Sequence, residues 1–481
     1  MWWIASALWA QDTRDFSQVL NADFQREFVG IVQIRQNNTL IYQYAKGNTI
    51  ADTAIDATSL LPVSSLISHT VSLMILNDLK SVKGSKEDRL QQYLPRLNKD
   101  ALGKDGVFCS VAHLLSHRCG LPTFVPGQQA DIGTFFSALN RIRLKDKPGQ
   151  NHRFSYAGDA LAFELLKSFH VEDPYQVLQR ELYQGCDIWG EIPPNRSNQQ
   201  MESVFYSLGM YGSVEDWFHV PHTGYKELAN HSVASADGLS CWFNTLLQQD
   251  RWKELLQSSE EHYGLGVAFE KKVYGDVIWH SSKVPLQSSG YWGLVPKTGY
   301  SVVVLSPQSN APYSPTRIGR ALLDTVHGLE SRTAIGDFRF GGKLQASLPV
   351  IVPLLTVLIP LIIAVFLVMR PPIPRLVFAM RLQSCFFAAI FVRLSTPFAT
   401  IPMYEWGGML LLFAIMLFRG LRKRIQAPLY PAWNLGLIAE FGIYSLLMMT
   451  WIRRVPNPTP LFCSVGIMAI LVSSIHTKKT D

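Results

Sequence analysis

The chain has 481 residues, enough for two or three domains, and carries a formal net charge of +7 with a pI near 9.0. A basic protein can bind nucleic acid, but the sequence contains no recognisable motif for it. Many basic residues instead cluster between apolar runs near the C-terminus, for example Arg370, Arg375, Arg419 and Arg422. This distribution is typical of the cytoplasmic loops of a membrane domain, so we exclude nucleic acid as a partner.

The N-terminal segment is apolar but too short to span a bilayer. It lacks the basic n-region of a signal peptide, yet it ends in small residues followed by Gln11, Asp12 and Thr13. We interpret residues 1–13 as the remnant of a secretory signal peptide. A frayed apolar terminus is the alternative.

The sequence contains six cysteines, and four of them precede the long apolar region: Cys109, Cys119, Cys186 and Cys241. Their spacing matches no zinc or redox motif, so we expect no metal ion and no cofactor. A helix predicted between Cys109 and Cys119 would hold these two residues too far apart for a disulfide. We therefore predict buried free thiols.

Residues 14–330 have the mixed pattern of a globular domain. Alternating apolar and polar residues from Phe28 to Ile50, around Asn37 and Asn38, predict a β-hairpin. Helical patterns dominate from Ser64 to about Leu247. Strands are predicted at Gly264–Phe269, Asp276–His280, Gly290–Val295 and Tyr300–Leu305, followed by an amphipathic helix from Thr316 to about His327. Strands at both ends with helices between them indicate an α/β (α+β) domain whose sheet is completed by distant parts of the chain.

A change in composition follows a linker over residues 331–347. Leu348–Met369 is an uncharged run that would be about 33 Å long as a helix, which is enough to cross a bilayer. Further apolar stretches extend a predicted all-α transmembrane domain of about five spans over residues 348–476, and residues 477–481 form a cytoplasmic tail.

Basic residues between the spans predict the orientation. Arg370–Arg381 and Arg419–Arg424 should be cytoplasmic, which places the globular domain outside. Arg453 and Arg454 fall on the outer side, which disagrees with this orientation. Either the number of spans differs by one or this loop is an exception to the rule. Glu440 lies inside an apolar stretch and is either a functional residue or one that faces a packed interface. The sequence thus predicts a multi-pass protein of a bacterial-type plasma membrane, with the lipid bilayer as a partner and the N-terminal domain extracytoplasmic.

Several segments resemble the serine β-lactamase-related family, which includes class C β-lactamases, DD-peptidases and related esterases. The most specific is VAHLLSHRCGLP over Val111–Pro122. Five further segments follow the same order and spacing as in the family: Gln91–Pro95, Pro148-Gly149, Phe154–Tyr156, Ala234–Leu239 and Tyr263–Val267. The resemblance covers most of residues 25–310. It implies a β-lactamase/penicillin-binding-protein-like domain with an antiparallel sheet and an inserted helical subdomain.

The resemblance also implies where the first catalytic motif, SxxK, should lie. Counting back from Tyr93-Leu94-Pro95 places the nucleophile at Ser65 and the lysine position at Ser68. A serine hydroxyl cannot replace the lysine as a base near neutral pH. His69, rotated about 100° around the helix, is either a solvent-facing or capping residue or, after a local shift, a substitute base.

The other two motifs are also altered. The YxN motif reads Tyr156-Ala157-Gly158, which keeps the tyrosine and loses the amide. Asp159 follows, but its side chain should point in a different direction from a side chain at residue 158. The HxG motif reads His280-Ser281-Ser282, which keeps the histidine and adds a side chain at Ser282. A literal Lys297-Thr298-Gly299 follows Pro296 and is predicted to be a hairpin turn.

Changes at Ser68, Gly158 and Ser282 together cost more than a standard acyl-transfer cycle tolerates. The leading hypothesis is a catalytically degenerate domain that binds a peptide, a cell-wall fragment or a partner protein. The alternative is an active esterase or DD-peptidase-like hydrolase that uses Ser65 with Tyr156 or His69 as base. In a third hypothesis the membrane domain carries the function and the outer domain is its sensor or lid.

Overall fold

The computed structural model describes residues 16, 19–97, 109–123, 132–142, 144–190, 193–207, 210–213, 232–257, 262–284, 287–309 and 313–329. All of them belong to one compact unit, which spans residues 1–124 and 131–350. Within these ranges no helix is long and apolar enough to cross a membrane. The signal remnant (1–13), the linker (331–347), the transmembrane domain (348–476) with Glu440, and the tail (477–481) lie outside the described residues and stay predictions.

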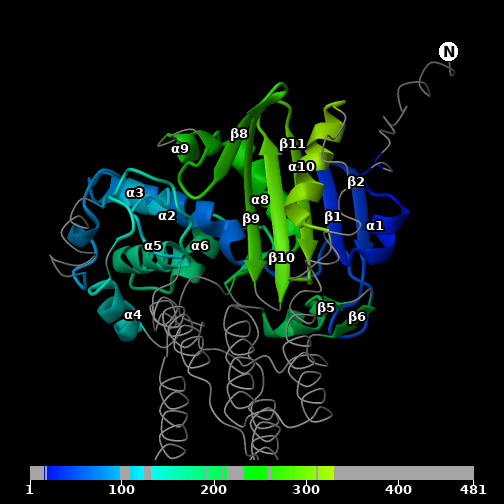
Figure 1. Cartoon of the computed structure of the whole chain (residues 1–481), viewed down its shortest axis with the longest axis horizontal. Coiled ribbons are helices and arrows are strands. Elements are labelled where there is room, and N and C mark those ends of the chain that lie inside the picture. The colour runs from blue at the N-terminus through cyan, green and yellow to red at the C-terminus, as the bar shows by residue number, and fades with distance from the viewer. Residues whose placement is uncertain are drawn as a thin grey trace, which may run out of the picture. The chain divides into compact units, whose positions relative to one another are not determined.

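One six-stranded antiparallel sheet is built from the two ends of the domain (Figure 1). The N-terminal hairpin joins the C-terminal strands because its first strand pairs with the last one. This confirms that distant parts of the chain complete one sheet. In spatial order the strands are β2 (Thr39–Lys46), β1 (Gly30–Gln36), β11 (Tyr300–Ser306), β10 (Ser288–Val295), β9 (Gly275–Val284) and β8 (Ala268–Lys272).

The structure corrects one predicted strand of this sheet and confirms one predicted turn. The strand predicted at Gly264–Phe269 was wrong at its start: β8 begins at Ala268, because residues 264–267 form a turn in which the Gly264 N–H donates to the carbonyl of Val267 (2.8 Å). The predicted turn at Lys297-Thr298-Gly299 is confirmed between β10 and β11. Gly299 has a φ of 71°, a conformation that favours glycine.

Both faces of the sheet are covered. On one face, alternate residues such as Val302 and Val304 pack against helix α1 (Ala22–Glu27) and helix α10 (Pro315–Val326), the latter close to the predicted amphipathic helix. On the other face, β1 contacts helix α8 (Ala236–Gln248). There, Gln33 donates to Asp237 (2.8 Å) and accepts from Ser240 (2.6 Å). Every residue of β10 and β11 is buried, so these strands form the centre of the domain.

Helices α2 to α6, inserted between β2 and β8, gather beside the β8–β9 side of the sheet, whereas α8 covers one of its faces (Figure 1). The inserted part of the chain also forms two small sheets. One consists of β3 (Leu61–Pro62), β7 (Val233–Ala234) and β4 (Ile188–Trp189), and the other of β5 (Val204–Ser207) and β6 (Met210–Ser213). The remaining helical elements are η2 (Ser64–Ile67), α2 (Ser68–Ser81), η3 (Leu90–Gln92), α3 (Val111–Leu115), α4 (Ile132–Leu139), α5 (Tyr156–Phe169), α6 (Pro174–Glu181), η5 (Pro194–Gln199) and α9 (Trp252–Leu256).

The 3₁₀ turn η2 is held directly against the central sheet. The indole N–H of Trp292 on β10 donates to the carbonyl of Leu66 at 2.8 Å. Gly290 allows the close approach, since a Cβ there would lie 2.8 Å from Cδ1 of Leu66. This contact places the segment that contains Ser65 next to β9.

The prediction of free thiols was wrong, because Cys109 is bonded to Cys119 and Cys186 to Cys241. Helix α3 between the first pair has only five residues, and the chain then reverses through His117 and Gly120, both with positive φ. The Cα atoms of this pair are therefore only 5.3 Å apart. The predicted separation assumed a helix that continued to the second cysteine.

We expect the two disulfides to contribute unequally to the free energy of unfolding. Cys186–Cys241 closes 55 residues and Cys109–Cys119 closes 10. From the loss of chain entropy in the unfolded state, we expect the double Cys→Ser variants to lose about 4 and about 3 kcal/mol, respectively. Urea unfolding followed by tryptophan fluorescence measures both losses, and wild-type protein with a reductant is the control. A larger loss for the Cys109/Cys119 variant would contradict this ranking.

Candidate active site

Ser65 lies in η2, one turn before helix α2, and is almost completely buried (5% exposed). Its hydroxyl donates to the backbone carbonyl of Ser281 on β9, at 3.5 Å. Ser64, directly before it, has a φ of 44°, which is uncommon for a residue other than glycine. The turn therefore brings the first-motif serine to the third-motif strand, but directs its hydroxyl to a backbone acceptor.

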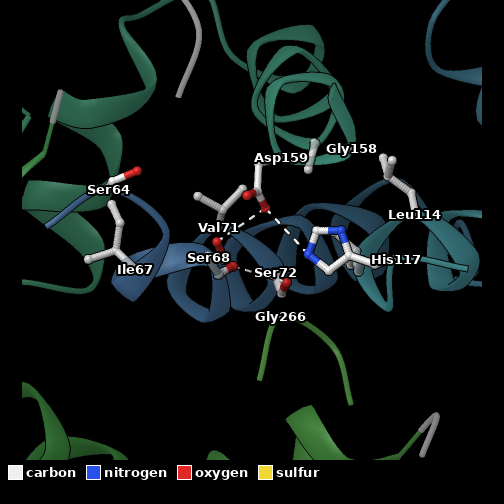
Figure 2. A pocket seen from close by; sticks show the side chains of 12 residues that line it. Ser64, Ile67, Ser68, Val71, Ser72, Leu114, His117, Gly158, Asp159 and Gly266 are labelled. Atoms are coloured by element: carbon white, nitrogen blue, oxygen red, sulfur yellow. Dashed lines mark hydrogen bonds and ion pairs between the residues drawn. The ribbon is translucent and has the colours of Figure 1, made fainter. Parts of the chain in front are cut away.

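Ser68 is the first residue of α2 and is partly exposed. Its hydroxyl donates to Oδ1 of Asp159 at 3.2 Å. Asp159 lies in the first turn of α5, a helix that Ser155 caps by accepting from the N–H of Gly158. Nε2 of His117 lies 3.6 Å from the same Oδ1, and Figure 2 shows the three side chains pointing toward one another. The position expected for a lysine thus forms a Ser68–Asp159–His117 cluster.

The order of groups in this cluster differs from that of a hydrolase triad. In a triad the imidazole lies between the serine and the carboxylate, so that it can take the serine proton. Here the carboxylate of Asp159 lies between the hydroxyl and the imidazole. Burial, together with the nearby His152 and His280, lowers the pKa of His117 to about 3, so the imidazole is neutral at physiological pH.

Among the described residues, no lysine or arginine lines the cavity beside Asp159. Its side chain is 11% exposed, and burial raises the pKa of this carboxyl to about 7. Within the described part of the chain, its Oδ2 and Nδ1 of His117 are buried and make no hydrogen bond. Such groups are uncommon in folded proteins and call for an explanation.

Gly158 and His117 are linked by contact. A Cβ at residue 158 would lie 3.2 Å from Nδ1 of His117, so a side chain at this position would require the imidazole to move. The observed position of the His117 ring therefore depends on the absence of a side chain at residue 158.

A cavity of about 20 Å³ lies between α2 and α5. Ser68, Ser72, His117 and Asp159 line it together with apolar side chains such as Val71. This volume is enough for one water-sized group, which needs roughly 10–15 Å³. Ser65, Tyr156 and His280, the three site residues predicted from the sequence, are not among the residues that line it.

His280 is buried on β9 and uses both ring nitrogens. Nδ1 lies 2.9 Å from the carbonyl of Ser281, which can only accept, so Nδ1 donates and Nε2 accepts from the hydroxyl of Tyr263 at 3.0 Å. Burial lowers the pKa of His280 to about 4. Tyr156 begins α5, where its backbone N–H donates to the carbonyl of Thr123 (3.0 Å).

His69 is neither solvent-facing nor a cap, contrary to the ordinary prediction for it. It is fully buried, because its position on α2 faces Trp242 of α8 and Trp292 of β10. Nε2 accepts a hydrogen bond from the indole of Trp242 at 2.8 Å. Burial lowers the pKa of His69 to about 3. Its basic lone pair is therefore occupied and is not available to Ser65.

The structure thus brings Ser65 to the third-motif strand and assembles a second group that sequence reasoning did not assign. His117 lies inside the segment that carries the strongest resemblance, and Asp159 directly follows the second motif. A carboxylate one position after a lost amide was the available signal. Its contact with Ser68 could not be deduced from spacing alone.

We expect Asp159 to make the free energy of unfolding depend on pH. An acid whose pKa is raised in the folded state binds its proton more tightly there than in the unfolded chain, where the pKa is about 3.9. Its contribution to stability is present below about pH 4, falls as the pH rises to about 7, and is constant above that. Relative to Asp159→Asn, which stays neutral, the wild type should lose on the order of a few kcal/mol across this window.

Urea unfolding between pH 4 and 8 in phosphate–citrate buffer without amines measures this difference. The buried histidines have lowered pKa values and act in the opposite direction, since their contribution is lost as the pH falls below about 6.5. They are present in both proteins and largely cancel. A difference between the two proteins that does not change with pH would show that Asp159 is not a buried carboxyl with a raised pKa.

No family profile matches the sequence, and no curated protein matches it. Solved structures with a similar fold include the following two. One is an octameric penicillin-binding protein homologue from Pyrococcus abyssi (TM-score 0.53, 15% identity, covering 64% of this chain and 76% of that one). The other is a class C β-lactamase from Rhodobacter sphaeroides (TM-score 0.53, 16% identity, covering 65% of this chain and 97% of that one). The described domain therefore has the serine β-lactamase/penicillin-binding-protein fold, with an antiparallel sheet, and is related in fold to serine hydrolases.

Proposed function

We propose that the chain is a membrane-anchored, extracytoplasmic protein whose β-lactamase-type domain binds a ligand without forming an acyl-enzyme. The ligand classes that fit the fold are a peptide, a cell-wall fragment or a segment of a partner protein. The observation that carries the proposal is the state of the two first-motif serines, Ser65 and Ser68.

Acyl transfer requires a base that takes the proton of the attacking serine. In the described part of the chain, the only hydrogen bond of the Ser65 hydroxyl is to the carbonyl of Ser281, an oxygen that cannot take a proton. The lone pairs of the two nearby imidazoles, His69 and His280, already accept hydrogen bonds from Trp242 and Tyr263. Both histidines also have strongly lowered pKa values, which makes them weak bases.

The location outside the cytoplasm rests on different observations. Two disulfides in one domain favour an oxidising compartment, because cytosolic thiols are normally kept reduced. The apolar stretches and basic loops of residues 348–476 favour anchoring in the plasma membrane with this domain outside.

An active serine hydrolase is the second candidate function. Use of Ser65 with His69 is disfavoured by the contact of His69 with Trp242. One observation favours a different nucleophile: the partly exposed Ser68 already donates to a carboxyl whose pKa is raised by burial to about 7. A base with a pKa near the working pH is suited to proton transfer. The two candidates differ in whether a serine becomes covalently labelled.

Covalent labelling separates these functions. We expect neither a fluorescent penicillin nor a fluorophosphonate to label the wild-type protein above the level of the double variant Ser65→Ala/Ser68→Ala, because the hydroxyl of Ser65 meets a backbone carbonyl and that of Ser68 meets a carboxyl in place of the lysine. Fluorescence of gel-resolved protein measures the label, and an active class C β-lactamase is the positive control. Ser81→Ala, a serine at the C-terminal end of α2 and outside the cavity lining, is the matched variant.

Labelling that disappears in Ser65→Ala but persists in Ser68→Ala would overturn the proposal in favour of a hydrolase with the nucleophile expected from the family. Labelling that disappears only in Ser68→Ala would establish the Ser68–Asp159 pair as catalytic. In either case, Ser81→Ala should retain the label.

Membrane anchoring predicts a second result. The full chain should sediment with membranes and resist extraction by alkaline carbonate, whereas a chain ending at residue 330 should be released into the extracytoplasmic fraction. Immunoblots of cell fractions, with protease added to intact spheroplasts, measure both. Full-length protein in the soluble fraction, or a domain protected from external protease, would contradict the proposed location.

A further inference from the structure

The cavity between α2 and α5 has a property that the proposed function does not use. It contains a carboxyl group, and in the part of the chain that the structure describes no lysine or arginine lines it. We propose that this cavity is a binding site for a primary ammonium group. The inference rests on the proposed function in one respect, namely that this part of the domain receives a ligand, and it names the chemical group that the ligand presents.

Three side-chain oxygens on residues that line the cavity are able to accept hydrogen bonds. The hydroxyl of Ser68 donates a hydrogen bond to Oδ1 of Asp159 (3.2 Å), and the hydroxyl of Ser72 donates to the backbone carbonyl of Ser68 (3.1 Å). Both hydroxyl oxygens keep lone pairs, and Oδ2 of Asp159 is buried and accepts no hydrogen bond within the described residues. A primary ammonium group has three N–H donors and no acceptor, which matches this set of three oxygens.

Charge favours the same occupant. A buried carboxylate is costly unless it is paired, and an unpaired one binds a proton instead. Within the described ranges, His117 is the only other ionisable side chain that lines the cavity. It is 3% exposed and supplies no charge at neutral pH because burial lowers its pKa to about 3. An ammonium group beside Oδ2 of Asp159 would supply the missing positive charge.

Size and access restrict the choice further. A volume of about 20 Å³ accommodates one water-sized group such as an ammonium head, but not a quaternary ammonium. Ser68 and Asp159 both keep part of their surface exposed, so the cavity reaches solvent beside them. A divalent metal ion is a poorer match, because it prefers several charged or carbonyl oxygens, whereas this site has a single carboxylate.

Amine-dependent stability of the full chain in detergent tests the proposal. Methylammonium chloride is titrated at pH 7 while unfolding is followed by tryptophan fluorescence, with sodium chloride and tetramethylammonium chloride at equal ionic strength as reference salts. At ten times its dissociation constant, methylammonium should lower the unfolding equilibrium constant of the wild type about elevenfold relative to either reference salt.

Two aspartate variants make the test specific. Asp159→Asn keeps the shape of the side chain and removes its charge, so its response to methylammonium should disappear. Asp78→Asn is the matched control, since Asp78 is a buried aspartate on α2 that pairs with His170 (2.9 Å) away from the cavity. This variant should respond like the wild type.

A spectroscopic measurement covers the case in which Asp159→Asn unfolds. At pH 6, binding should ionise the carboxyl, and the infrared band of a protonated carboxyl should decrease when methylammonium replaces sodium. An equal response to sodium or tetramethylammonium, an equal response in Asp159→Asn, or no response in either measurement would each overturn the ammonium site. None of these results would change the covalent-labelling outcome, so failure here is distinguishable from failure of the proposed function.

Discussion

The antiparallel pairing of β1 with β11 is the constraint on which the rest of the domain depends. It joins residues about 270 positions apart, such as Ile31 and Leu305, and closes the sheet from the two ends of the domain. With β1 on one side and β9 on the other, β10 and β11 become central strands that are buried on both faces. The indole of Trp292 on β10 can then reach the carbonyl of Leu66, which fixes η2 beside β9.

The site that results has the geometry of a serine hydrolase fold but an unusual charge distribution. Ser65 lies against the third-motif strand, as the resemblance implies, yet its hydroxyl meets a carbonyl and no base. Where the family has a lysine, Ser68 contacts a carboxyl. The site therefore lacks the positive charge that would normally balance a carboxylate, and the surrounding imidazoles are kept neutral by burial.

The departures from the family motifs are coupled through contacts. Ser68 touches Asp159, Asp159 lies beside His117, and the ring of His117 occupies the space next to Gly158. A side chain at residue 158 would therefore require the ring of His117 to move. In the described part of the chain, the hydroxyl of Ser282 is also buried without a hydrogen bond, so the third motif carries an unsatisfied group of its own.

The sequence by itself determined the elements whose signals are local. Period-two alternation predicted the hairpin, the amphipathic pattern predicted α10, and the turn signal after Pro296 identified Lys297-Thr298-Gly299 as a connection. The C-terminal strands were also predicted from their own segments of sequence. Motif order predicted the fold, because neighbouring residues carry enough information to recognise it even where the catalytic groups have changed.

Only the tertiary structure decided which distant residues meet. Ser68 and Asp159 are 91 positions apart and His69 and Trp242 are 173 apart, and the disulfides depend on a short helix and on where α8 lies. Periodicity tells which side of an element is buried, but the partner on that side is selected by the packing of the whole domain. For that reason the sequence revealed a missing lysine, and the structure revealed the unpaired carboxyl that lies in its place.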